Sequence, residues 1–175
     1  GGYDKMIQKY TYGTPFETDA IVTSIPASEG TPAYGTISTE NGFSFTYDMD
    51  DNDVVYGLGE SNRGINKRGY VYESNCSDQP NHTEDKISLY GAHNFLVISG
   101  KQTFGLFVDY PGKLKFDIGY TLSSQLKITC EDADLYLYVI EGETPYDIVK
   151  QFRKIIGRSY IPPKFAFGFG QSRWG

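Results

Sequence analysis

Short stretches of alternating apolar and polar residues dominate the chain. Over 43–47, three aromatic side chains point to one side of an extended strand, while Ser44 and Thr46 point to the other. This period of two is typical of a strand with one buried and one solvated face. Comparable short segments fall at 6–12, 20–25, 54–58, 93–99, 103–110, 114–118 and 126–130. Because Gly- and Asp-containing turns separate them, the pattern predicts an all-β fold, an antiparallel β-sandwich.

Two segments near residue 140 depart from this pattern. The run 135–140 is apolar on both faces, so we expect a strand in the centre of a sheet or beneath another element. The segment 144–157 has a helical period, with Thr144 as N-cap and Pro145 at the first helical position. Its apolar stripe consists of Ile148, Phe152, Ile155 and Ile156. We predict one helix here, after the sandwich.

The last part of the chain, 158–175, reads as a connector followed by a new strand. Pro162 and Pro163 make the connector stiff and extended. Alternation resumes over 164–175 and runs to the last residue. Because an unpaired apolar strand exposes hydrophobic surface and an open edge, we interpret this segment as the first strand of a further domain.

The longest stretch without periodicity is 60–91, which is rich in Asn, Ser, Asp and Gly. Loops of this length in compact domains are uncommon and tend to be functional or disordered. The chain therefore divides into an expression remnant or disordered start at 1–5, a sandwich at 6–143 that carries this loop, the helix at 144–157, and the linker with the start of a second domain at 158–175.

Length and charge narrow the function classes. With 175 residues the chain is shorter than a complete (β/α)8 barrel of about 250 residues. A net charge of −6 argues against nonspecific binding to nucleic acid or to an anionic membrane, since both require a positive field. Two cysteines, Cys76 and Cys130, are too few for a disulfide scaffold. Idle thiols are favoured over a disulfide, and cytoplasm is the default expectation.

No motif in the sequence builds a metal or cofactor site. The acidic cluster 48–53 begins like a calcium loop, but it lacks the Gly at the sixth position and the Glu at the twelfth. We interpret it as a solvated turn. His82 and His93 are eleven residues apart, which is no metal-ligand spacing. The sequence also gives no reason to pair any two carboxylates across a sugar pocket. No cofactor and no metal are predicted.

Several motifs occur together in a defined order. They are Tyr56–Glu60 (YGLGE), Ser88–Gly91 (SLYG), Thr103–Tyr110 (TFGLFVDY), Pro145–Val149 (PYDIV), Gly157-Arg158, Pro162–Gly168 (PPKFAFG) and Gln171–Gly175 (QSRWG). In this combination the chain resembles the N-terminal part of glycoside hydrolase family 31 from about Asp53 onward. The resemblance implies a galactose-mutarotase-like β-sandwich whose C-terminal helix leads to the first strand of an absent (β/α)8 barrel.

The same resemblance implies an α-glucosidase-like, retaining hydrolase that acts on an α-glucoside or oligosaccharide. Its two catalytic aspartates would lie on the barrel, beyond Gly175, so this chain alone should be inactive. The sandwich would pack against the barrel of the same polypeptide and lend the loop 60–91 to the sugar pocket. Asp78 matches the position of a sugar-binding acid, with a loop-capping role as the alternative. Trp174, at the end of the first barrel strand, is a second candidate for a sugar contact, with a core or interface role as the alternative.

Two other functions stay open. An independent carbohydrate-binding module would also use an aromatic-rich sandwich and a polar loop with Asp78. A sugar mutarotase would need a general acid and base, commonly His with Glu, and neither His82 nor His93 has an evident carboxylate partner in the sequence. Exposure of the apolar segment 164–175 would further favour self-association of the chain.

Overall fold

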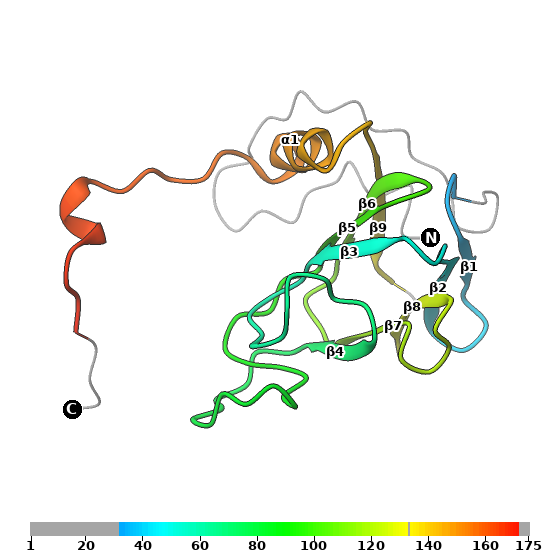
Figure 1. Ribbon diagram of the computed structural model, residues 1–175, viewed down its shortest axis with the longest axis horizontal. Coiled ribbons are helices and arrows are strands. Elements are labelled where there is room, and N and C mark those ends of the chain that lie inside the picture. Colours follow the sequence, from blue (N-terminus) through cyan, green and yellow to red (C-terminus); the bar gives the residue numbers. More distant parts are fainter. Residues whose placement is uncertain (1–31, 133, 172–175) are drawn as a thin grey trace.

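The computed structural model describes residues 32–132 and 134–171, which form two antiparallel sheets and a covering helix (Figure 1). The first sheet has the strand order β1-β2-β8-β7-β4, and the second has the order β3-β5-β6-β9. The elements are β1 Thr36–Ser38, β2 Phe43–Asp48, β3 Val54–Gly57, β4 Tyr70–Ser74, β5 Phe95–Ser99, β6 Thr103–Asp109, β7 Leu114–Ile118, β8 Gln125–Cys130, β9 Tyr136–Glu141 and α1 Pro145–Ile156. The predicted antiparallel β-sandwich is confirmed.

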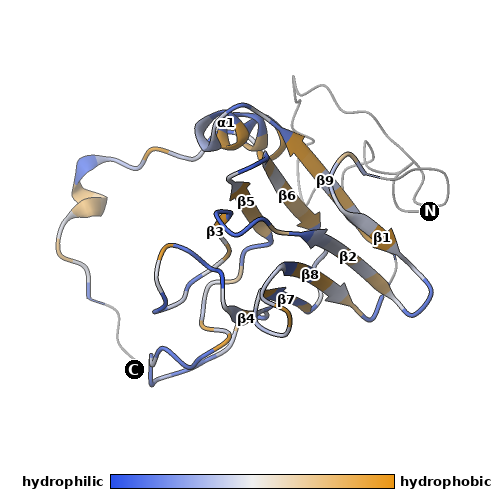
Figure 2. Cartoon of the chain, turned by 45° about the vertical axis from the view of Figure 1, so that its right-hand side comes forward, coloured by the Kyte–Doolittle hydropathy of each residue, from blue (hydrophilic) through white to orange (hydrophobic). Residues whose placement is uncertain are grey.

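The main core lies between the two sheets, because each strand turns every second side chain inward. In the first sheet, Phe45 lies opposite Ile128 and both are fully buried. In the second, Phe104 and Leu106 face them from β6. The rings of Phe104 and Tyr34 stack with centroids 4.2 Å apart. Figure 2 shows these apolar positions along the strands of both sheets.

Most expected strands coincide with observed ones to within two residues, and two observed strands were not expected. The segments 6–12 and 20–25 lie outside the described residues. The short strand β1 was missed, and β4 lies inside the stretch 60–91 that was interpreted as a loop. The apolar run 135–140 corresponds to β9. Among the described strands, β9 is an edge strand of the second sheet, and it packs beneath α1. The interpretation as a strand beneath another element is therefore correct.

Helix α1 covers the outer face of the second sheet and makes a second, smaller core there (Figure 1). Phe152 stacks on Phe95 of β5 with ring centroids 3.9 Å apart. Ile148 lies directly over Gly105 of β6, where an added Cβ would come within 2.4 Å of the Ile148 side chain. The expected stripe is wrong at Ile156, which is exposed because it lies about 100° around the helix axis from Ile155, which packs against this core.

The N-terminus of α1 is held by a capping box. The Thr144 hydroxyl accepts a hydrogen bond from the Asp147 amide, and the Asp147 carboxylate accepts one from the Thr144 amide, both at 3.2 Å. We expect Thr144→Ala to lower the free energy of unfolding by about 1 kcal/mol, since the Asp147 amide loses its acceptor and the Asp147 carboxylate loses the hydroxyl that donates to it. Urea denaturation measures the loss. Thr144→Ser keeps the hydroxyl and should stay near the parent value; equal losses for both variants would contradict the capping role.

The C-terminal part differs from the expected strand. Lys164–Phe167 form a 3-10 turn, and 168–171 have no regular structure. A strand needs a hydrogen-bonded neighbour, and no described strand lies beside this segment, which extends away from the sandwich (Figure 1). The side chains of Phe165 and Phe169 are 83% and 96% exposed. Trp174 lies outside the described residues, so its role stays a prediction.

Two further observations concern the whole described part of the chain. Cys76 is exposed and Cys130 is buried, and the structure has both as free thiols, as expected. In the part of the chain that the structure describes, no helix is both long and apolar enough to cross a membrane.

Candidate functional site

A shallow hollow lies where the stretch after β3 meets the end of β4. It is lined by Leu58–Glu60, by Tyr72–Ser74, by Ile87–Leu89 and by Gly91–His93, and it has a volume of about 20 Å³. That volume has room for about one water molecule and is far below the ~300–1,000 Å³ of typical ligand pockets. Beside the hollow, residues 75–90 extend from the sandwich (Figure 1); we call them the projecting loop.

The base of the hollow joins two of the sequence motifs. The Glu60 amide donates to the Gly91 carbonyl at 2.7 Å, and the Gly91 amide donates to the Glu60 carboxylate at 3.1 Å. Gly59 packs so closely against this contact that an added Cβ would lie 2.0 Å from the Gly91 oxygen. The motifs YGLGE and SLYG are therefore joined in the fold, because the last residue of each donates a hydrogen bond to the last residue of the other.

The projecting loop has two arms that pair with each other. The Ser77 amide donates to the Leu89 carbonyl at 2.8 Å, and the Glu73 amide donates to the Ile87 carbonyl at 2.9 Å. The Leu89 side chain is fully buried and fixes the returning arm to the sandwich. The loop is thus an irregular extension of β4, and its backbone is held at a definite place.

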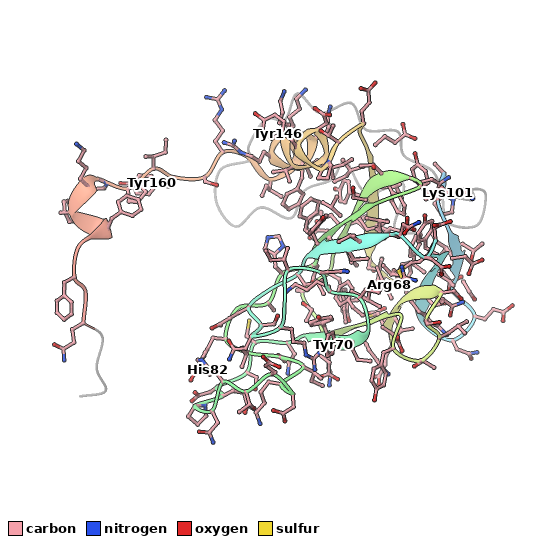
Figure 3. All side chains as sticks on the ribbon, in the orientation of Figure 1. Arg68, Tyr70, His82, Lys101, Tyr146 and Tyr160 are labelled. Carbon is pink, nitrogen blue, oxygen red and sulfur yellow. The ribbon has the colours of Figure 1, made fainter. Side chains whose placement is uncertain are left out.

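The predicted site residue Asp78 lies on the outgoing arm and is exposed. Its carboxylate accepts a hydrogen bond from the Tyr90 hydroxyl at 2.8 Å. That hydrogen bond raises the pKa of Tyr90, since it favours the protonated phenol. The imidazole of His82 meets the Tyr90 ring edge-on, with centroids 5.4 Å apart. Asp78, Tyr90 and His82 form a cluster on the projecting loop, and Figure 3 labels His82.

This cluster offers hydrogen-bond acceptors and aromatic faces at the surface. A carboxylate offers about four acceptor positions, and Tyr90 occupies one of those on Asp78, so the others can accept from sugar hydroxyls. The exposed aromatic faces beside it can pack on the apolar face of a sugar ring. Tyr90 was missed as a site residue from the sequence alone. It lies twelve positions from Asp78, and only the pairing of the two arms brings them together.

The floor beneath the loop contains buried polar groups. Lys67 donates from Nζ to the Ser61 hydroxyl at 3.1 Å and to the Gly64 carbonyl at 3.2 Å. Burial, and then the nearby Arg63, lower the pKa of Lys67. Tyr72 is buried, and its hydroxyl has no hydrogen-bond partner among the described residues. Burial raises the pKa of Tyr72. These groups support the segment on which the loop rests.

The structure shows no metal-binding group among the described residues. Within 32–132 and 134–171, no three His, Cys, Asp or Glu side chains gather as a metal-binding group. His93 packs edge-on against Phe95 and Phe152 and is separate from His82. The acidic cluster 48–53 begins at the end of β2 and forms the turn to β3. The expectation of a solvated turn is wrong at Asp53, which is buried because its carboxylate accepts hydrogen bonds from the Asp50 and Lys101 amides.

Comparison with known proteins decides the family. A profile described as the glycosyl hydrolase 31 N-terminal galactose mutarotase-like domain matches residues 11–117. The chain belongs to this family. This family 31 N-terminal domain is 31% identical over 145 residues to alpha-glucosidase 2 of Bacillus thermoamyloliquefaciens, covering 77% of the chain and 18% of that protein. It is 27% identical over 120 residues to the alpha-xylosidase XylQ of Lactiplantibacillus pentosus, covering 69% and 15%.

Solved structures agree with this assignment. The GH31 dextranase of Flavobacterium johnsoniae, in complex with isomaltotriose, superposes with a TM-score of 0.69 at 25% identity, covering 76% of the chain and 16% of that protein. The cycloalternan-degrading enzyme of Trueperella pyogenes shares the fold, with a TM-score of 0.61 at 17% identity and coverages of 87% and 22%. The family 31 N-terminal domain thus spans less than a quarter of these relatives. The resemblance drawn from the ordered motifs is confirmed.

Proposed function

We propose that this chain is the non-catalytic N-terminal domain of an α-glucosidase-like retaining glycoside hydrolase. It supports a catalytic barrel of the same polypeptide and lends the projecting loop to the sugar pocket. Family membership and the glycosidase names of the relatives support the enzyme class. The single observation that carries the role of the loop is the exposed Asp78 carboxylate, which Tyr90 orients from the opposite arm.

The hollow and the cluster fit a shared pocket better than a complete one. The hollow is shallow, and the three side chains of the cluster stand on one side of any sugar they would contact. A partner surface such as the mouth of a barrel would supply the other side and the two carboxylates of the reaction. The exposed apolar side chains of Phe165, Phe167 and Phe169 provide surface for that partner to cover.

Asp78→Asn in the full-length protein tests this proposal. Asparagine keeps an oxygen that accepts from Tyr90, so the loop should stay in place while the charged contact to a sugar hydroxyl is lost. Hydrogen bonds to charged groups contribute about 1.5–3 kcal/mol, so we expect the KM for an aryl α-glucoside to rise about tenfold or more. Steady-state kinetics measure it. The 175-residue chain alone should give no turnover.

Glu84→Gln is the matched control, because Glu84 is an exposed acid of the same loop and loses its charge in the same way. It should leave KM unchanged. Equal KM values for Asp78→Asn and the parent would refute the sugar contact. Calorimetry on the chain alone separates the alternative: heat of binding with isomaltose at millimolar concentration would support an independent carbohydrate-binding module.

A further inference from the structure

One short segment, Ser61–Gly64, contacts the tip of the projecting loop through its side chains. The Asn62 amide donates to the His82 carbonyl. The Arg63 guanidinium donates from Nε to the Glu84 carbonyl at 2.8 Å and from a terminal nitrogen to the Asp85 carbonyl at 3.4 Å. Three backbone carbonyls of the tip are thus bound from outside the loop.

Arg63 also binds the sheet. Its other terminal nitrogen donates to the Val71 carbonyl of β4 at 2.7 Å. The guanidinium carbon lies 4.4 Å from the ring centroid of Tyr70 and 5.0 Å from that of Tyr72. A guanidinium stacked on aromatic rings has a fixed plane, so its hydrogen bonds leave in fixed directions. The Arg63 side chain therefore links strand β4 to the tip of the loop. The two tip carbonyls that it binds belong to residues 21 and 22 positions after it in the chain.

The segment that carries Arg63 is itself anchored. Lys67 is 8% exposed and donates to groups on both sides of Arg63, the Ser61 hydroxyl and the Gly64 carbonyl. A long side chain that is held at its base and stacked at its head loses little entropy when it binds the loop. The contact is therefore preorganised.

We propose that Arg63 is a positioning residue for sugar binding: it fixes the projecting loop to β4 and so sets where the Asp78–Tyr90 pair meets the substrate. The proposal rests on the proposed function for the sugar contact itself, whereas the restraint on the loop stands on the contacts of Arg63 alone. Displacements of about 1 Å in such groups cost large factors in binding and rate, so a loose loop would weaken sugar binding with the pair still present.

Arg68 provides a matched control in the same structure. Its guanidinium also donates to backbone carbonyls, those of Asp50 at 2.6 Å, Asp53 at 3.1 Å and Ser123 at 3.0 Å. These belong to the β2–β3 and β7–β8 connections, away from the loop tip (Figure 3). Arg68→Ala removes a comparable set of hydrogen bonds and reports the effect of general destabilisation.

The experiment uses the full-length protein with Arg63→Ala, Arg63→Lys, Arg68→Ala and Asp78→Asn. Hydrogen exchange by mass spectrometry follows the loop amides, including those of Ser77 and Lys86. We expect at least about tenfold faster exchange there in Arg63→Ala, because the tip loses two carbonyl contacts to a charged donor. Arg63→Lys should recover only part of the protection, since an ammonium group cannot hold three carbonyls and two rings. Arg68→Ala should leave loop exchange at the parent rate.

Kinetics on the same variants give the second readout. KM for an aryl α-glucoside should rise about tenfold in Arg63→Ala with kcat within about twofold, while Arg68→Ala changes neither. Unchanged loop exchange in Arg63→Ala would overturn the restraint, and so would an equal increase in Arg68→Ala. Faster exchange in Arg63→Ala with an unchanged KM would overturn the effect on sugar binding. If Asp78→Asn also leaves KM unchanged, the proposed sugar contact is refuted. The restraint of the loop by Arg63 is judged separately, from the hydrogen exchange of the loop amides.

Discussion

Gly59→Ala is expected to lower the free energy of unfolding by about 3 kcal/mol, because the new methyl group has no space at the base of the projecting loop. A Cβ at Gly59 would lie 2.0 Å from the Gly91 oxygen and 2.9 Å from the Ala92 Cα. Both neighbours are backbone atoms, so no side-chain rotation relieves the overlap. The chain must separate there and lose the hydrogen bonds between Glu60 and Gly91.

Urea denaturation measures this loss, and Gly64→Ala is its control. Gly64 lies five residues further along, and an added Cβ there would meet no atom within 4 Å. We expect Gly64→Ala to stay within about 0.5 kcal/mol of the parent. A Gly59→Ala variant as stable as Gly64→Ala would show that the base of the loop opens without cost, and the proposed support for the projecting loop would fail with it.

The strands that were predicted well are those whose alternation is enforced by the core. In β2, β7 and β8 every second residue is buried between the sheets, so the fold requires apolar side chains at that period. The strand β4 was missed since it lies at the edge of its sheet, where only Tyr72 is buried. An edge strand with one buried residue leaves too weak a pattern to separate it from a polar loop.

Alternation alone does not form a strand where no partner strand is present. Residues 164–175 have the strand pattern, yet Lys164–Phe167 form a 3-10 turn in the structure. The pattern records which faces are apolar, whereas a strand also needs a neighbour that accepts its backbone hydrogen bonds. Periodicity can indicate that a segment suits a sheet; it cannot supply the second strand.

The candidate site was predictable only in part, and the reason is the nature of its contacts. Asp78 was placed through the family resemblance, while Tyr90 and Arg63 were not identified. Tyr90 reaches Asp78 through loop geometry, and the acceptors of Arg63 are backbone carbonyls. Every residue has a carbonyl, so such contacts leave no trace in the identity of the residues that accept. Side-chain chemistry can be read from a sequence, but backbone acceptors require the fold.

The second large effect is expected at Asp53, the buried carboxylate of the β2–β3 turn. Asp53 is 2% exposed and accepts hydrogen bonds from the Asp50 amide at 2.9 Å, the Lys101 amide at 3.0 Å and the Tyr47 hydroxyl at 3.2 Å. Burial, and next the Asp53 charge, raise the pKa of Tyr47 to about 12, so this hydroxyl keeps its proton and donates. One carboxylate thus joins β2 to the β5–β6 turn, which holds the two sheets together at this end.

Asp53→Ala should lower the free energy of unfolding by about 3 kcal/mol, because the amides of Asp50 and Lys101 lose their acceptor in a site that excludes water. Tyr47 has Gln102 Oε1 at 3.4 Å as a second acceptor, so its hydroxyl is the donor best able to adapt. Asp53→Asn keeps one carbonyl oxygen and should lose about half as much. Thermal and urea unfolding, followed by tyrosine fluorescence, give both values.

Asp51→Ala is the control for the loss of one acidic charge from the same turn, since Asp51 is exposed. It should change stability by no more than about 0.5 kcal/mol. If Asp53→Ala were equally mild, the turn would be held by its backbone and by Arg68, which binds the Asp50, Asp51 and Asp53 carbonyls from the other side. A large loss for Asp53→Ala alone would instead show that this acidic run, which resembles the start of a calcium loop, has a structural role. Its carboxylate at Asp53 then binds the backbone amides of Asp50 and Lys101 where a calcium loop would bind an ion.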